Sequence, residues 1–119
     1  MKQILIEKYI EPSEIEVDGN WIFETWVDRN YDKHSFMGQP AGIYYYCGEI
    51  MEQHWKKKGI LHRDRDLPAV LYYLNTEAQR KDWYKKGKLH REGEKPAVVR
   101  YNNGKIISQE WFKNGELIK

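Results

Sequence analysis

The sequence contains a single cysteine, Cys47, among its 119 residues. A lone cysteine excludes an internal disulfide bond and a cysteine-rich zinc site. Because Cys47 lies within an apolar and aromatic run, we expect a buried, unreactive thiol. The chain also lacks a charged-then-apolar N-terminal leader and any apolar stretch of about 18 residues, so neither secretion nor membrane insertion is indicated. We therefore expect a reducing, cytoplasmic location and no membrane partner.

A helical pattern is also lacking, since no segment repeats its apolar residues with the 3.6-residue period of an amphipathic helix. Aromatic residues instead make up 14% of the chain, with nine Tyr and five Trp, a composition typical of β-structure. Strand patterns spaced roughly 8–12 residues apart predict an antiparallel meander of about eight or nine strands. At this length we expect one all-β domain.

The sequence does contain a repeat of about 28 residues that occurs three times. The spacing is kept by His34, His62 and His90, by Pro40, Pro68 and Pro96, and by Tyr45, Tyr73 and Tyr101. Trp55 and Trp83 begin the second and third copies, and Trp111 begins a partial fourth. We divide the chain into an acidic cap (1–25), repeats at 26–54, 55–82 and 83–110, and a partial repeat at 111–119. A fixed period of this size indicates units that stack to bury a shared core, so these repeated residues are expected to be scaffold.

Turn residues follow the strands of each copy. Asn103-Gly104 and Asn114-Gly115 favour tight type I′ hairpin turns, with a strand over 105–112 between them and a third strand from 116. Equivalent turns are expected at Cys47-Gly48, Lys58-Gly59, Asn75-Thr76 and Lys86-Gly87. Thr76 tolerates positive φ poorly, so its turn is expected to open into a longer loop.

The N-terminal third shows the same strand patterns. Residues 15–23 predict a hairpin that turns at Asp18-Gly19. Ile4, Ile6 and Ile10 share one parity, which indicates an earlier strand with one apolar side.

Alternation along the strands predicts two distinct sheet faces. One face is expected to be the packed core face and to carry Ala41, Ile43, Tyr45, Ala69, Leu71, Tyr73, Ala97, Val99 and Tyr101. The other is expected to be half exposed, and it carries our candidate protein-binding residues Tyr44, Tyr46, Tyr72 and Arg100. Aromatic and arginine side chains are favoured at such surfaces because they supply much contact area at low entropic cost.

The three repeated histidines suggest a metal site at first sight. If each repeat contributes two or more strands, equivalent histidines lie roughly 9–10 Å apart, whereas metal-bound donor atoms lie about 2 Å from their ion. We therefore expect His34, His62 and His90 to be structural, and the histidines together with Arg63 and Arg91 to close the loop before the proline by bonding backbone carbonyls. No metal or other cofactor is expected, and no recognisable catalytic set indicates an enzyme.

Charge is distributed unevenly. Residues 1–30 hold seven acids and three bases, a balance of −4, so the remainder of a chain with net charge +2 carries +6. Six lysines fall at equivalent hairpin tips: Lys56, Lys57, Lys58, Lys85, Lys86 and Lys113. Such a stripe is interpreted either as protection of sheet edges against unwanted pairing or as a surface that binds nucleic acid or a nucleotide-like anion.

The motif from Trp83 through Gly87, Leu89, His90 and Arg91 to Pro96-Ala97, with its partial copy at 111–117, resembles the variant MORN-type repeats of bacterial, phage and large-virus proteins. The resemblance covers about residues 26–119. It departs from the usual pattern at Gln39, Leu67 and Lys95, where a glycine is expected before the proline. The resemblance implies a curved antiparallel sheet that binds a partner, often another protein, and some relatives are similar to antitoxins or immunity proteins. It brings no catalytic residue with it.

Three functions remain as hypotheses. The first is a non-enzymatic inhibitor, of antitoxin, immunity or counter-defence type, that binds and blocks a protein effector, in the host cytoplasm if the protein is phage-encoded. The second is a binder of nucleic acid or a nucleotide-like anion through the lysines. The third is a structural module that adds strands to its own copies and so forms homo-oligomers through its sheet edges.

Overall fold

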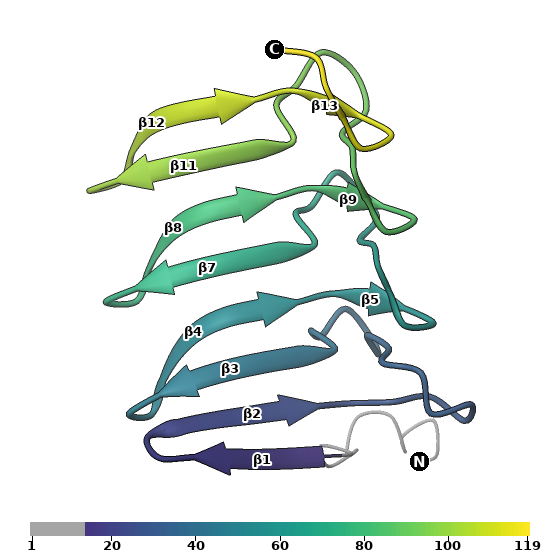
Figure 1. The fold of residues 1–119 in the computed structure, drawn as a ribbon, viewed down its shortest axis with the longest axis vertical. Coiled ribbons are helices and arrows are strands. Elements are labelled where there is room, and N and C mark those ends of the chain that lie inside the picture. The colour runs from purple at the N-terminus through teal and green to yellow at the C-terminus, as the bar shows by residue number, and fades with distance from the viewer. Residues whose placement is uncertain (1–13) are drawn as a thin grey trace.

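Residues 14–119 are described by the computed structural model, and they contain fourteen strands and no helix. Eight strands form one open antiparallel sheet in the order β1-β2-β3-β4-β7-β8-β11-β12. Their bounds are Glu14–Asp18 (β1), Trp21–Thr25 (β2), Gly42–Tyr46 (β3), Glu49–His54 (β4), Val70–Leu74 (β7), Glu77–Asp82 (β8), Val98–Asn102 (β11) and Lys105–Glu110 (β12). Figure 1 shows these strands as successive rungs, which confirms the expected antiparallel meander.

Six short strands form a second column beside the main sheet (Figure 1). They pair as three hairpins: β5 (Lys56–Lys57) with β6 (Ile60–Leu61), β9 (Tyr84–Lys85) with β10 (Lys88–Leu89), and β13 (Phe112–Lys113) with β14 (Glu116–Leu117). The prediction of one continuous strand over 105–112 is therefore wrong, because the strand is interrupted at Trp111. The strand expected from 116 forms, but it pairs only with β13.

Backbone hydrogen bonds hold the hairpins of this column together. Each turn glycine donates its N–H to a carbonyl of the preceding copy, from Gly59 to Lys33, from Gly87 to Leu61 and from Gly115 to Leu89, at 2.7–2.8 Å. These three glycines have φ between 81° and 87°, a left-handed backbone that glycine adopts at little cost. The repeated Lys-Gly or Asn-Gly pair therefore serves both the turn and the stacking of copies.

The core lies where the main sheet meets the column of hairpins. Trp83, Ala97 and Val99 form a buried cluster, and Tyr101 and Phe112 pack against it. Each repeated tryptophan donates its indole N–H to a loop carbonyl 17 residues earlier, from Trp55 to Gly38 (2.9 Å), from Trp83 to Asp66 (3.0 Å) and from Trp111 to Glu94 (3.3 Å). The tryptophans therefore occupy equivalent positions, as predicted.

The second face of the sheet is not uniformly half exposed. Val70 and Val98 lie on it and are buried, with 2% and 1% of their surfaces exposed, because they sit at the strand ends nearest the hairpins. Exposure increases toward the opposite strand ends, where Tyr46 and Leu74 lie. Solvent exposure therefore changes along each strand as well as from one face of the sheet to the other.

Three predictions about turns and cysteine burial need correction. Asn75 and Thr76 form a tight two-residue turn with φ of 52° and 67°, so the turn does not open into a longer loop. Cys47 is exposed rather than buried, since it is the first residue of the equivalent turn. The first hairpin turns at residues 19–20, one position later than predicted, because Asp18 pairs with Trp21.

Two further points concern the N-terminal segment and membrane-spanning helices. The predicted strand with Ile4, Ile6 and Ile10 lies outside the described residues. Within 14–119, no helix has the length and apolar character needed to cross a membrane.

The turn at Thr76 generates a stability prediction. A β-branched residue in the left-handed region costs about 1–2 kcal/mol, and the equivalent positions in the other copies are Gly48 and Gly104. We expect Thr76→Gly to raise the free energy of unfolding by about 1 kcal/mol, after the entropic cost of a new glycine. Chemical denaturation measures this change. The reverse substitution, Gly104→Thr, is the matched control and should destabilise; an unchanged or less stable Thr76→Gly variant would contradict the prediction.

Candidate functional site

The candidate protein-binding residues meet on one broad face of the sheet. Cross-strand register places Phe23, Tyr44, Glu52, Tyr72, Arg80 and Arg100 in one row across six neighbouring strands. Tyr46 and its register partner Trp21 lie on the same face, nearer the strand turns. We call Trp21, Phe23, Tyr44, Tyr46, Tyr72, Arg80 and Arg100 the tyrosine face. All four predicted residues are therefore brought together.

Sequence reasoning missed three members of this face. Trp21, Phe23 and Arg80 become neighbours of the tyrosines only once the strand register is known. The parity of 21–25 would have placed Trp21 and Phe23 on one side of their strand. Which side that is depends on the pairing of β2 with β3, and no local pattern specifies that pairing.

Ring contacts hold the side chains of the tyrosine face in place. The rings of Phe23 and Tyr44 stack with centroids 3.9 Å apart, and those of Trp21 and Tyr46 lie 5.0 Å apart. The guanidinium of Arg80 lies 5.3 Å from the centre of the Tyr72 ring, within cation–π distance. Aromatic side chains fixed in this way lose little further freedom when a partner binds them.

In each copy, the last residue of the second long strand bonds a charged side chain on this face of the sheet. His54, Asp82 and Glu110 are 28 residues apart at the ends of β4, β8 and β12. Nε2 of His54 lies 3.0 Å from Glu52 Oε1, Arg80 Nε donates to Asp82 Oδ1 at 2.8 Å, and Arg100 Nη1 donates to Glu110 Oε1 at 2.6 Å. The two arginines are therefore held by carboxylates at the hairpin side of the face.

Asp82 is the buried member of these three anchors, with 0% of its surface exposed. Burial raises the pKa of its carboxyl, against the lowering effect of Arg80. Its Oδ2 atom has no hydrogen-bond partner among the described residues. Because Asp82 is enclosed, it positions Arg80 rather than offering itself to a partner.

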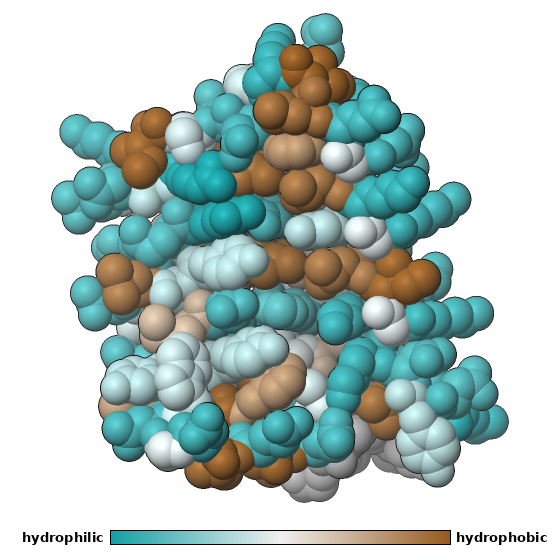
Figure 2. Space-filling model, viewed as in Figure 1, coloured by the Kyte–Doolittle hydropathy of each residue, from teal (hydrophilic) through white to brown (hydrophobic). Residues whose placement is uncertain are grey.

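The tyrosine face is acidic at its β1 end, whereas the arginines toward its other end are paired with carboxylates. A groove of about 410 Å³ at the β1 end is lined by aromatic rings together with the carboxylates of Glu16, Asp18 and Glu52. Burial raises the pKa of the Tyr44 hydroxyl, and Glu52 and Glu16 raise it further. Arg80 and Arg100 lie toward the β12 end. Figure 2 shows brown and teal side chains interleaved over the visible broad face, without one large apolar patch.

The six lysines do follow the column of hairpins, but half of them are engaged. Lys113 Nζ donates to the carbonyls of Arg91 and Gly93 at 3.0 Å each, and Lys85 Nζ lies 2.7 Å from Glu92. Lys56 is half-buried, and this burial lowers its pKa, as does nearby Lys33. Of these six, only Lys57, Lys58 and Lys86 are exposed and have amino groups that make no hydrogen bond or ion pair with residues 14–119. The continuous cationic stripe is therefore weaker than the sequence suggested.

The repeated histidines join consecutive copies of the block. Nδ1 of His34, His62 and His90 accepts a hydrogen bond from the backbone N–H of the residue 24 positions later, at 3.1, 3.1 and 3.0 Å. Since Nδ1 is the acceptor, we assign the ring proton to Nε2, which faces Asp64 in the second copy (2.8 Å) and Glu92 in the third (3.0 Å). The predicted structural role thus takes a different form, because the backbone partner is a turn N–H and not a carbonyl.

The arginines after the second and third histidines do bond backbone carbonyls. Arg63 Nη1 donates to Pro68 and Arg91 Nη1 to Pro96, at 3.1 and 3.0 Å. The same guanidinium groups lie over the rings of Trp55 and Trp83, 3.7 and 3.8 Å from the ring centres. Each histidine-arginine pair therefore ties one loop to its tryptophan and to the next hairpin.

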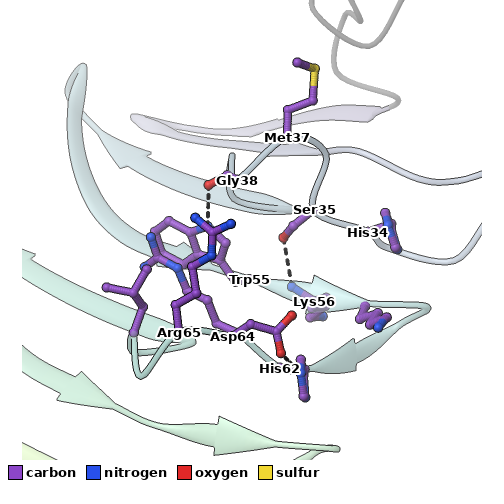
Figure 3. Close-up of a pocket in the computed structure, with 12 residues that line it drawn as sticks. His34, Ser35, Met37, Gly38, Trp55, Lys56, His62, Asp64 and Arg65 are labelled. Atoms are coloured by element: carbon purple, nitrogen blue, oxygen red, sulfur yellow. Dashed lines mark hydrogen bonds and ion pairs between the residues drawn. The ribbon is translucent and has the colours of Figure 1, made fainter. Parts of the chain in front are cut away.

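Two grooves lie between the loops that carry these pairs. The first has a volume of about 670 Å³ and lies between the loops 34–38 and 62–67 (Figure 3). The second is equivalent, one copy later, with about 160 Å³. In the second groove Arg91 and Lys95 bind the Asp66 carboxylate and lower its pKa to about 2.

Neither a cluster of metal-binding side chains within residues 14–119 nor similarity to known proteins identifies a further site. Within the described part of the chain, no three His, Cys, Asp or Glu side chains are grouped so that they could hold a metal ion. Comparison with protein-family models, with curated proteins and with solved structures found no match to this chain. The geometry of the surfaces is therefore the evidence on function.

The histidine bridges generate a stability prediction. Replacing His62 or His90 by Phe keeps a ring but leaves a turn N–H without its acceptor, which should cost about 1–2 kcal/mol per site. Thermal unfolding measures the loss. His54→Phe is the control, because within residues 14–119 the imidazole of His54 bonds the Glu52 side chain and no backbone group. Stoichiometric zinc or nickel in protein purified without added metal would instead show that the histidines are ligands.

The pair of Asp66 with Arg91 generates a pH prediction. The folded pKa of Asp66, about 2, lies below the unfolded value of about 3.9. The carboxylate therefore stabilises the fold above the unfolded pKa, and this contribution is lost as pH falls through the folded one. We expect Asp66→Asn to lower stability at pH 7 by no more than about 1 kcal/mol, because the pair is partly exposed. The difference should shrink as pH falls from about 5 toward 2 and disappear below the folded pKa of about 2; a constant difference across this range would contradict the ion-pair account.

Proposed function

We propose that this protein is a non-enzymatic interaction protein that binds a partner protein through the tyrosine face. The observation that carries the proposal is the row of stacked aromatic rings and anchored arginines across the main sheet. Aromatic and arginine side chains dominate the binding energy of protein interfaces, above all where they are held in position before binding. The MORN-like motif supports the same kind of function.

The charge distribution favours a protein partner over nucleic acid at this face. Glu16, Asp18 and Glu52 surround the aromatic groove at the β1 end. Carboxylates in this position repel phosphate, whereas nucleic-acid surfaces combine aromatic rings with basic side chains. A partner that is basic where it meets the β1 end would be complementary.

The most concrete form of this function is inhibition. The interleaved apolar and charged side chains of the face suit a partner that also exists free in solution, because permanent interfaces are usually more apolar. An inhibitor of antitoxin, immunity or counter-defence type, which occupies an effector protein in the cytoplasm, has such a partner. The binding of nucleic acid or a nucleotide-like anion through the exposed hairpin lysines is the alternative.

The experiment that tests this function is affinity capture from the native host followed by mass spectrometry, repeated with surface variants. We expect the combined Tyr44→Ala, Tyr46→Ala and Tyr72→Ala variant to lose the captured protein while keeping a cooperative unfolding transition. Reversing the charge of Lys57, Lys58 and Lys86 should leave capture intact. These three lysines are chosen because Lys56, Lys85 and Lys113 make contacts within the fold.

Tyr31→Ala is the matched control, because Tyr31 is 85% exposed and lies outside the tyrosine face. It should capture the partner as the natural protein does. Loss of the partner by the lysine variant, with retention by the tyrosine variant, would contradict the proposal and favour the electrostatic alternative.

A further inference from the structure

Equivalent residues in the two grooves differ at one decisive position. Gly38, in the first groove, and Asp66, in the second, are 28 residues apart, and each accepts the indole hydrogen bond of the following tryptophan through its carbonyl. In the second groove the Asp66 carboxylate receives two hydrogen bonds from Arg91, at 2.9 Å from Nε and 3.2 Å from Nη2. Gly38 has no side chain, so the first groove lacks this carboxylate.

Arg63 in the first groove is the counterpart of Arg91. Both arginines lie over a tryptophan ring and donate Nη1 to a proline carbonyl. Within residues 14–119, however, Nε and Nη2 of Arg63 have no hydrogen-bond acceptor, whereas those of Arg91 are bound to Asp66. Arg63 is partly buried, and this burial lowers its pKa. A desolvated cation without a counter-ion favours the arrival of an anion.

The space for such an anion is open. A Cβ atom added at Gly38 would have no atom of the described residues within 4 Å, and the first groove is larger than the second, at about 670 Å³ against 160 Å³. In Figure 3, Gly38 lies beside Trp55 across the groove from the loop that carries Asp64 and Arg65. Among residues 14–119, one arginine site is therefore filled by a carboxylate of the chain, and the equivalent site is left unfilled.

The lining of the first groove indicates the chemistry of the missing group. Four cationic side chains, Lys56, Lys57, Arg63 and Arg65, face a single carboxylate, Asp64, which is itself bonded to His62. The second groove balances four cations against three carboxylates. Met37 and Leu67, which are 58% and 41% exposed, add apolar surface to the first groove.

We infer that the first groove binds an acidic peptide segment of a partner protein, with an Asp or Glu carboxylate on Nε and Nη2 of Arg63 in the position that Asp66 fills beside Arg91. A peptide fits better than a small acid, because further cations and apolar side chains extend the groove beyond the space of one carboxylate. This site is separate from the tyrosine face, so either can fail without the other.

The test is an NMR titration at low salt that follows the arginine Nε–H resonances of the full chain. The probe is a blocked peptide of alternating glutamate and leucine, and its glutamine-for-glutamate counterpart is the control. We expect the acidic peptide to move the Arg63 resonance in a saturable way, while the Arg91 resonance stays in place. The combined substitution of Tyr44, Tyr46 and Tyr72 should not change this response.

Three variants sharpen the result. Gly38→Asp supplies an internal carboxylate and should weaken binding about tenfold or more, the equivalent of a charged hydrogen bond. Gly38→Asn introduces the same backbone strain without the charge and should bind the peptide still. Asp66→Gly opens the second groove, so the Arg91 resonance should then respond as well, which tests the site even if Gly38→Asp does not fold.

Several outcomes would overturn the inference. An Arg63 resonance that ignores the acidic peptide would do so, as would equal loss of binding in Gly38→Asp and Gly38→Asn. If acetate at matched carboxylate concentration produced the same shift, the groove would bind free carboxylates and not a peptide. A single-stranded oligonucleotide that saturates the Arg63 response in place of the peptide would assign the groove to nucleic acid.

Discussion

The structure depends on one repeated interaction, in which a turn N–H of each small hairpin donates to the imidazole Nδ1 of the preceding copy. A sheet of short strands has little interior, so its copies need a second column of contacts to stay in register. The histidine supplies an acceptor at the turn, and the glycine beside that donor bonds a carbonyl of the same preceding copy. Each copy is thereby joined to the next through the main sheet on one side and through the hairpins on the other.

This arrangement separates scaffold from function. The histidines, tryptophans and turn glycines make the same contacts 28 residues apart, so they explain why the copies stack and not what the protein binds. The candidate binding surfaces lie where the copies differ. Gly38 replaces the aspartate of the second loop, and the row across the main sheet changes from carboxylates and aromatic rings near β1 to arginines near β11.

Much of the architecture followed from periodicity alone. The spacing of His34, His62 and His90 predicted the stacking, and alternation within each strand predicted that Tyr44, Tyr46, Tyr72 and Arg100 share a face. The errors arose where tertiary contacts override local preference. Thr76 is held in a tight turn by the strand pairing on either side. Cys47 is exposed because it lies in the equivalent hairpin turn, which its own sequence predicted and which outweighs the apolar run before it.

The candidate sites were less accessible from the sequence than the fold. Arg80 and Phe23 join the tyrosine face only through cross-strand register, which depends on contacts between distant residues. The first groove is recognised as a candidate site only when Arg63 is compared with Arg91 in the structure. Both arginines stand in the same motif, and only the three-dimensional structure shows that Arg91 has a carboxylate partner whereas Arg63 has none within the described part of the chain.

The measurement that tests the account most directly is the detection of NMR scalar couplings across the three N–H···N hydrogen bonds that join the copies. We expect couplings from the backbone nitrogens of Lys58, Lys86 and Asn114 to Nδ1 of His34, His62 and His90, respectively, with the ring proton on Nε2. If the couplings are absent and Nδ1 carries the proton, the histidines do not join the copies and the stacking must have another cause.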